Sequence, residues 1–137
     1  MKSIKLVLMF LVFFAFACST NESSTKIDTG TFFRNLESAP VVIAPKSELP
    51  EWLKEMIDLY ESGGENGIPV SSQFYQGKCN KQVVYYIRIA AANCPMCFFF
   101  LGNGENIVWE NGLEEVEKFL SKCKDWMLVY QTGTYPF

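Results

Sequence analysis

The sequence contains no histidine, little positive charge and, beyond one N-terminal stretch, no long hydrophobic run. Without imidazole groups the chain has no Ser-His or Cys-His nucleophilic pair, no histidine general base and no histidine ligand for a metal. Lys and Arg number 12 against 15 Asp and Glu, which gives a net charge of -3 over 137 residues. This acidic balance argues against a nucleic-acid partner and against electrostatic attraction to anionic lipid.

The N-terminal stretch has the three parts of a secretory signal peptide. It opens with two lysines, continues with a hydrophobic run, and ends with small side chains at Ala15 and Ala17. The run covers only residues 6–17, whereas a membrane-spanning helix needs about 20 residues. We therefore expect residues 1–17 to be a signal peptide that is removed from the mature protein.

A cysteine directly follows the small residue at the expected cleavage site. Ala15-Phe16-Ala17-Cys18 resembles the bacterial lipobox, in which the cysteine receives a diacylglycerol group and becomes the new N-terminus. The resemblance implies lipidation of Cys18, and paired acyl chains hold a protein stably on a bilayer. We therefore expect a lipid-anchored protein of the bacterial cell envelope, at the outer membrane, with a plainly secreted protein as the alternative. Loss of the two N-terminal lysines leaves the mature chain at -5.

A polar segment separates the lipobox from the first regular pattern. It begins with small, polar residues that show no periodicity and cannot bury enough surface to fold. We expect residues 18–40 to form a flexible tether and residues 41–137 to form a single domain. Phe32, Phe33 and Leu36 are the large apolar residues of the tether, and the sequence leaves open whether they pack on the domain or form a short helix.

Hydrophobic periodicity divides the domain into helices and strands. Helical spacing predicts a helix that opens at Pro50 and ends before Gly63, and a second helix over residues 112–123, capped by Asn111 with Glu114 in the capping-box position. Alternation and short apolar runs predict strands over residues 41–43, 70–76, 82–91, 97–101, 106–110 and 126–131. The predicted fold class is α+β, an antiparallel sheet of four to five strands with two helices packed on one face.

Four short motifs follow the lipobox in order. They are Leu49-Pro50-Glu51-Trp52-Leu53, Tyr75-Gln76-Gly77-Lys78, Val84-Tyr85-Tyr86-Ile87 and Cys94-Pro95-Met96-Cys97. Together with the lipobox they resemble a family of small lipoproteins common in Bacteroidota, for which no activity is established. The resemblance covers residues 49–110, and the C-terminal part departs from the Gly-rich ending of that family. It implies an envelope location and the fold class, and it implies no mechanism.

The Cys94-Pro95-Met96-Cys97 motif also resembles the active dithiol of glutaredoxin-like enzymes. In those enzymes a helix N-terminus lowers the pKa of the first thiol. Here a predicted strand over residues 97–101 follows the motif in place of a helix. We therefore expect a structural disulfide, with thiol-disulfide exchange as an alternative. A zinc site is a third possibility, although zinc sites usually show two close pairs of ligands and Cys79 and Cys123 stand alone. We expect no cofactor.

Strand geometry limits how the cysteines can pair. With Cys18 reserved for lipid, Cys79, Cys94, Cys97 and Cys123 remain, and three connectivities are possible. The strand over residues 82–91 separates Cys79 from Cys94 by roughly 33 Å, whereas disulfide-linked Cα atoms lie within about 7 Å. We therefore predict the pairs Cys79–Cys123 and Cys94–Cys97.

Aromatic and acidic residues provide the candidate binding surfaces. Phe98, Phe99 and Phe100 are consecutive, and Tyr86 lies on the face of its strand opposite the first predicted helix. These four residues could form an exposed aromatic platform for a glycan or an envelope protein, unless the tether or the helices cover both sheet faces. We expect a non-enzymatic, lipid-anchored protein with a binding domain. The acidic surface of the first predicted helix leaves an inhibitor or immunity-type interaction protein as an alternative.

Overall fold

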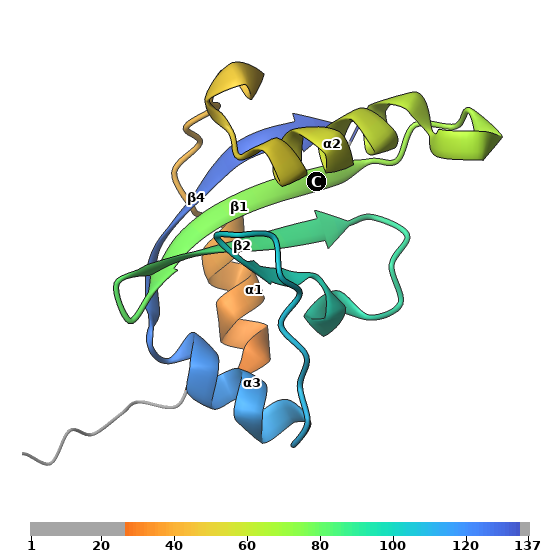
Figure 1. The fold of residues 1–137 in the computed structure, drawn as a ribbon. Coiled ribbons are helices and arrows are strands. Elements are labelled where there is room, and N and C mark those ends of the chain that lie inside the picture. The colour runs from red at the N-terminus through yellow and green to blue at the C-terminus, as the bar shows by residue number, and fades with distance from the viewer. Residues whose placement is uncertain (1–26, 135–137) are drawn as a thin grey trace, which may run out of the picture.

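The computed structural model describes residues 27–134 (Figure 1). The expected signal peptide over residues 1–17 and the lipidation site Cys18 lie outside the described residues. The elements are α1 (Thr29–Glu37), η1 (Lys46–Glu48), α2 (Glu51–Ser62), η2 (Gly64–Asn66), β1 (Ser72–Cys79), β2 (Gln82–Ile89), η3 (Pro95–Cys97), β3 (Phe99–Leu101), α3 (Leu113–Leu120) and β4 (Cys123–Thr132). In this part of the chain no helix is long and apolar enough to cross a membrane.

The strands form one antiparallel sheet with the order β3-β2-β1-β4, which confirms the predicted α+β class. The two residues between β1 and β2, Asn80 and Lys81, both have positive φ angles, as a tight type I′ hairpin turn requires. Residues 41–43 run along the outer edge of β4, where a parallel bridge joins Val41 to Leu128. The expected edge strand is therefore reduced to a short extension of the sheet.

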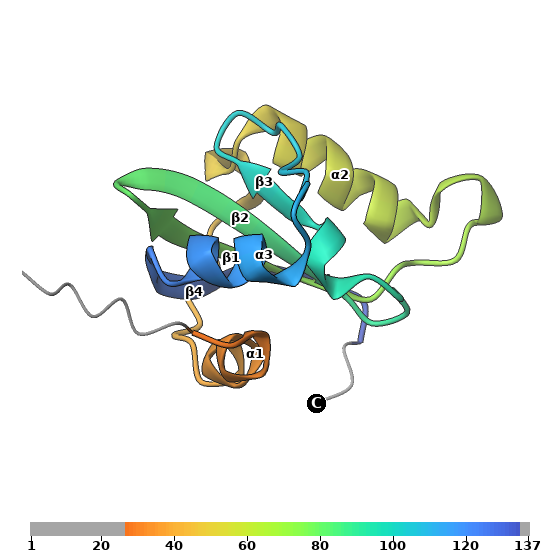
Figure 2. The same ribbon diagram turned by 90° about the horizontal axis from the view of Figure 1, so that it is seen from below.

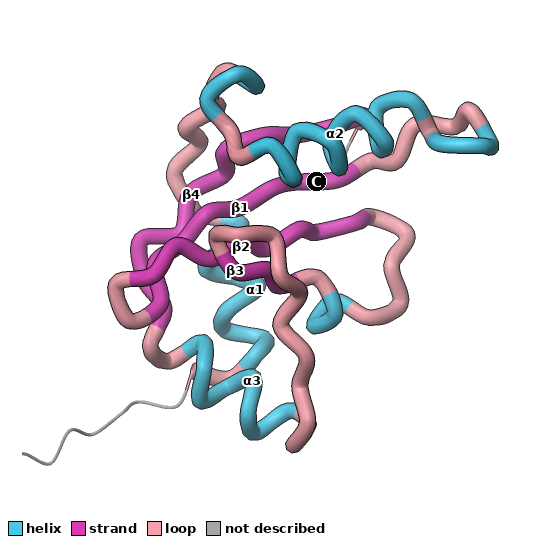
Figure 3. Tube along the Cα trace, in the orientation of Figure 1, coloured by secondary structure: helices cyan, strands magenta, loops and turns pink. Residues whose placement is uncertain are grey.

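The expected strand over residues 106–110 is not formed, and this corrects the sequence prediction. Figure 3 shows the connection from β3 to α3 as loop, and a single bridge joins Phe100 to Asn106. After that bridge the chain leaves the sheet, because Trp109 packs its indole ring 5.8 Å from the ring of Phe99 and 5.3 Å from that of Phe119. Burying the Trp109 indole ring therefore stabilises the fold more than further hydrogen bonds between this segment and the sheet would.

Helices cover both faces of the sheet, which corrects the expectation that two helices share one face (Figure 2). On one face Leu53 and Ile57 of α2 pack with Phe74 and other strand residues. On the opposite face α1 and α3 cover Tyr86 and Phe99. The physical reason is that β2 alternates between apolar side chains on both faces, so each face must be removed from water.

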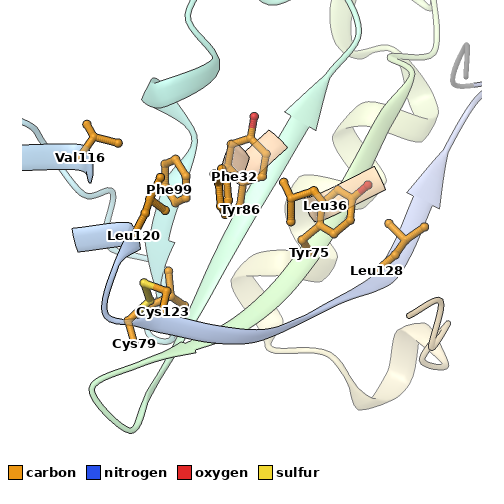
Figure 4. Close-up of a cluster of buried hydrophobic side chains, with 11 residues drawn as sticks. Phe32, Leu36, Tyr75, Cys79, Tyr86, Phe99, Val116, Leu120, Cys123 and Leu128 are labelled. Atoms are coloured by element: carbon orange, nitrogen blue, oxygen red, sulfur yellow. A yellow bond between two sulfur atoms is a disulfide. The ribbon is translucent and has the colours of Figure 1, made fainter. Parts of the chain in front are cut away.

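The first helix lies inside the expected tether. The Asp28 side chain caps α1 by accepting a 2.8 Å hydrogen bond from the Thr31 backbone N–H. Phe32 and Leu36, one helical turn apart, are 4% and 2% exposed and pack beside Tyr86 and Tyr75 (Figure 4). The folded domain therefore begins before α1, and the boundary expected at residue 41 is wrong.

The two predicted helices are present, with differences at the start of the second. Helix α2 ends at Ser62 and is followed by Gly63, whose φ of +75° and close approach to Ile68 leave no space for a side chain. Helix α3 begins after Gly112 and has no side-chain cap from Asn111. The carboxylate of Glu115, and not that of Glu114, accepts 2.8 Å hydrogen bonds from the backbone N–H groups of Glu110 and Asn111.

Candidate functional site

A hollow of about 350 Å³ lies between α1 and the end of β2. Its walls come from three segments: α1, the second half of β2, and the turn that carries Cys94 and Cys97. The lining residues are Phe33, Tyr86, Ile87, Arg88, Ile89, Ala90, Ala92, Pro95 and Phe98. This size and this mostly apolar lining are typical of small-ligand sites. We name it the α1–β2 pocket.

Three aromatic side chains line the α1–β2 pocket. The Phe33 ring centroid lies 5.9 Å from that of Tyr86, which in turn lies 4.5 Å from the Phe99 ring in the core beneath. Phe98 closes the other side and is partly exposed. Because Tyr86 is packed into the core, the wall it forms has a fixed position. Tyr86 is only 1% exposed, so the aromatic faces that a ligand can reach are those of the partly exposed Phe33 and Phe98.

Arg88 is the single charged residue among those that line the pocket. Its Nη2 atom lies 3.6 Å from Oε1 of Glu37, the last residue of α1, and its side chain is 28% exposed. The ion pair holds the guanidinium at the pocket wall and links β2 to α1. A guanidinium presents several N–H donors in one plane and matches the oxygens of a carboxylate or phosphate.

The structure contains both predicted disulfides. Cys94 and Cys97 form one, with Cα atoms 5.5 Å apart, and Cys79 and Cys123 form the other, with Cα atoms 4.0 Å apart. Cys123 opens β4, whereas the sequence predicted that it would end the second helix, so its disulfide joins two neighbouring strands.

The Cys94–Cys97 turn is held beside the pocket by side-chain hydrogen bonds. The Trp109 indole N–H donates to the Met96 carbonyl oxygen at 2.7 Å, and the Asn106 amide donates to the Cys97 carbonyl oxygen at 2.9 Å. Pro95, inside the turn, lines the pocket. The disulfide and these two bonds therefore fix one rim of the site.

The expected aromatic platform is not present on the surface, which corrects that prediction. Tyr86, Phe99 and Phe100 are 1%, 0% and 9% exposed, because α1 and α3 cover one sheet face and α2 covers the other. Phe98 alone is partly exposed. Two of the four residues, Tyr86 and Phe98, line the α1–β2 pocket, whereas Phe99 and Phe100 belong to the two cores.

Sequence reasoning missed two residues of the site, Phe33 and Arg88. Phe33 was assigned to the tether, and its only signal was a place in the apolar triplet with Phe32 and Leu36. Arg88 lies two residues after Tyr86 and therefore on the same face of β2, but no sequence signal indicated that α1 would lie over that face. The pocket exists because α1 packs there.

The local structure at Cys94 differs from that of dithiol enzymes. Only the three-residue η3 follows Cys94, and β3 comes next, so no α-helix N-terminus faces the first sulfur. Both cysteines are nevertheless exposed. Over residues 27–134 no group of three or more Cys, Asp or Glu side chains could hold a metal ion, and the four cysteines here are paired as disulfides.

The acidic surface of α2 is partly neutralised from the preceding segment. The Lys46 ammonium forms ion pairs with Asp58 and Glu61 of α2, and these raise its pKa above the ordinary value. The Tyr130 hydroxyl donates a 2.7 Å hydrogen bond to Glu61, and this bond, with Lys46, lowers the pKa of the Glu61 carboxyl. The cluster ties η1, α2 and β4 together and has a structural role.

Comparison of the chain with protein-family models, with curated proteins and with solved structures found no match.

Proposed function

We propose that the protein is anchored by lipid in the bacterial cell envelope and that its disulfide-stabilised domain binds a ligand without transforming it. The observation that carries the binding role is the α1–β2 pocket, whose lining combines the partly exposed rings of Phe33 and Phe98 with one guanidinium, that of Arg88. No carboxylate, amine or thiol lines the pocket, and the phenol of Tyr86 belongs to a side chain that is 1% exposed.

The ligand class follows from the lining. Aromatic faces stack against the apolar face of a sugar ring, and a guanidinium binds a carboxylate. We therefore propose an acidic glycan unit as the ligand. The two disulfides support an extracytoplasmic location, because such bonds persist in oxidising compartments. The lipobox at Cys18 supports the anchor.

The binding role is tested by titrating the purified full-length protein with acidic and neutral oligosaccharides and measuring the heat of binding. Replacement Arg88→Met should weaken binding of the acidic sugar at least tenfold, because a charge-assisted hydrogen bond contributes about 1.5–3 kcal/mol. Phe98→Ala should weaken acidic and neutral sugars alike. Arg34→Met is the matched control, since Arg34 is exposed on α1 and does not line the pocket.

A result in which Arg88→Met and Arg34→Met bind equally would reject the pocket as the site. Circular dichroism of each variant checks that loss of the Arg88–Glu37 ion pair has not unfolded α1. The anchor is tested separately, by mass spectrometry of the N-terminal peptide for acyl groups on Cys18. Cys18→Ser should release the protein from the envelope fraction.

Thiol-disulfide exchange remains the second candidate because Cys94 and Cys97 are exposed. An insulin-reduction assay tests it. Activity that disappears in a folded Cys94→Ser variant would establish the enzyme and would replace the binding proposal.

An inhibitor or immunity-type role would use the acidic α2 surface. Binding of a basic partner protein that is lost in Glu55→Lys would support this role.

A further inference from the structure

The end of the sheet at the β1–β2 turn carries a concentrated positive surface. Lys78, Lys81, Lys122 and Lys124 surround a hollow of about 450 Å³ together with Asn80 and Asp125, and all four lysines are exposed. They come from the end of β1, the hairpin turn, and the chain that enters β4. We name these four lysines the lysine basin.

The lysine basin differs from three cationic groups of the domain whose charge is neutralised locally. Lys46, Lys54 and Arg88 form ion pairs with nearby carboxylates. Within residues 27–134, none of the basin lysines forms such a pair, and Asp125 is the one carboxylate that lines the hollow. Four positive charges and one negative charge therefore share one site in a protein whose net charge is -3. The net charge of the sequence hides this local excess.

The fold holds these charges together against their repulsion. Lys78 and Lys124 are direct cross-strand partners on β1 and β4, and like charges in that position destabilise a sheet. The next pair along the same strands, Cys79 and Cys123, is covalently joined. The disulfide therefore keeps the lysines adjacent. An arrangement that is unfavourable for the isolated domain becomes favourable when an anionic surface lies against it.

The backbone geometry of the lysine basin also indicates that its positive charge has a role. Lys81 and Asp125 have φ angles of 67° and 57°, a conformation that side-chain-bearing residues rarely adopt. Lys81 stands at the hairpin position where glycine is the usual residue. A lysine at this turn therefore accepts backbone strain that a glycine would avoid, and it adds one more charge to the basin.

We propose that the lysine basin binds the phosphate groups of anionic lipids, so that the β1–β2 end of the domain rests on the membrane. The proposal rests on the lipid anchor proposed above. Four exposed lysines spread around a broad hollow, without a buried donor, suit a surface of many phosphates better than a single enclosed ion. Figures 1 and 2 both show the described chain beginning toward this end of the sheet.

Chain length is compatible with this contact. The nine residues from Cys18 to Ile27 span at most roughly 30 Å, so an acylated Cys18 keeps the domain near the bilayer. The acidic helix α2 lies over the opposite part of the sheet, away from the β1–β2 turn (Figure 1). The orientation that brings the basin to the membrane therefore keeps the acidic helix surface away from it.

The test uses full-length acylated protein reconstituted into vesicles of phosphatidylcholine, alone or mixed with phosphatidylglycerol. A membrane-impermeant reagent labels exposed amines, and mass spectrometry reports labelling at each lysine. Phosphatidylglycerol should lower labelling of the basin lysines about fivefold or more at low salt, and added salt should restore it. Lys54 on α2 is the internal reference and should keep its labelling.

A pair of variants matched in net charge checks the assignment. In Lys78→Gln/Lys124→Gln the protection of the remaining Lys81 and Lys122 should be lost. In Lys54→Gln/Lys118→Gln, which removes the same charge outside the basin, protection should persist. Equal labelling of the basin lysines in both kinds of vesicle would overturn the proposal. So would equal protection by inorganic phosphate added to phosphatidylcholine vesicles, which would assign the basin to a soluble anion.

The mass of the N-terminal peptide separates this proposal from the anchor. If Cys18 is not acylated, the anchor is wrong, and co-sedimentation of the unmodified protein with the same vesicles still tests the basin. Pelleting that requires phosphatidylglycerol and is reversed by salt supports the basin, whereas its absence overturns it.

Discussion

Cys79 and Cys123 are register partners on β1 and β4, and their disulfide closes a loop that contains two strands, η3 and α3. Loss of this disulfide, in Cys79→Ala/Cys123→Ala, should lower the free energy of unfolding by about 4 kcal/mol, because a long loop regains its freedom in the unfolded chain. Cys94→Ala/Cys97→Ala opens only a four-residue loop and should cost about 2 kcal/mol. Urea denaturation of both variants under identical conditions measures the difference. The reverse order would contradict this account of the two bonds.

Gly104 and Gly112 provide a matched test of packing against backbone strain. Both have positive φ, 89° and 69°, but a side chain at Gly104 would come within 2.7 Å of the Trp52 ring, whereas nothing lies near Gly112. The ring cannot retreat, because its N–H donates to the Gly102 carbonyl oxygen at 3.0 Å. Gly112 has φ 69° and ψ -147°, a conformation that residues with a side chain avoid, so Gly112→Ala should cost about 1–3 kcal/mol from backbone strain. Gly104→Ala should cost about 1–3 kcal/mol more, because the ring of Trp52 occupies the space. Thermal unfolding followed by tryptophan fluorescence distinguishes the two.

Phe98 and Phe99 are neighbours with different roles. Phe99 is fully buried among five aromatic rings, so Phe99→Ala should leave a cavity and cost about 3–5 kcal/mol. Phe98 lines the pocket and is partly exposed, so Phe98→Ala should cost about 1 kcal/mol and mainly affect ligand binding. Equal destabilisation by the two substitutions would place Phe98 in the core as well.

The hydrogen bond between Tyr130 and Glu61 should make stability depend on pH. The Glu61 pKa is lowered in the folded protein, first by this bond and then by Lys46, so the stabilisation is present above the ordinary value of 4.5 and is lost as pH falls through the lower, folded value. The Tyr130 pKa is raised, mainly by Glu61, so the stabilisation is also lost as pH rises above the ordinary value of 10.0. Tyr130→Phe should remove the alkaline part of this dependence and weaken the acid part, in which Lys46 still lowers the Glu61 pKa.

The expected size of that effect is small. The Glu61 side chain is 41% exposed, and water screens such pairs, so Tyr130→Phe should cost about 0.5 kcal/mol near neutral pH. The difference from the unmodified protein should shrink below pH 4.5 and above pH 10.0. Chemical denaturation across this pH range measures it. A difference that stays constant from acid to alkaline pH would contradict the role of the ionised Glu61.

Local patterns in the sequence were sufficient for the elements that form from neighbouring residues. Proline before α2, glycine after it, and the alternation of β2 each act through local backbone or side-chain preferences. The disulfide pairing was also predictable, because an extended strand physically separates Cys79 from Cys94. In α2, in β2 and in the separation of Cys79 from Cys94, interactions between residues close in sequence determine the structure.

The parts that could not be predicted depend on contacts between distant segments. Helix α1 forms because Phe32 and Leu36 cover Tyr86 and Phe99. The polar residues that precede them along the chain gave no indication that this segment would be needed to bury the sheet. The α1–β2 pocket needs α1 in place, so its lining could not be deduced earlier. The net charge likewise does not indicate where charged residues lie on the surface. The lysine basin could be identified only from the pairing of β1 with β4, which brings its lysines together.

Lys78 and Lys124 allow stability and membrane contact to be changed in opposite directions. Because the two ammonium groups stand directly opposite on β1 and β4, Lys78→Glu replaces repulsion with attraction and should stabilise the domain by about 0.5–1 kcal/mol at low salt. Lys78→Gln removes the repulsion without adding an attraction, so its free energy of unfolding should lie between those of the unmodified protein and Lys78→Glu. High salt should reduce the differences among the three proteins. The same Lys78→Glu variant should lose the protection of Lys81 and Lys122 on phosphatidylglycerol vesicles. A gain in stability with unchanged protection would show that the repulsion is real but that the basin has no lipid to bind.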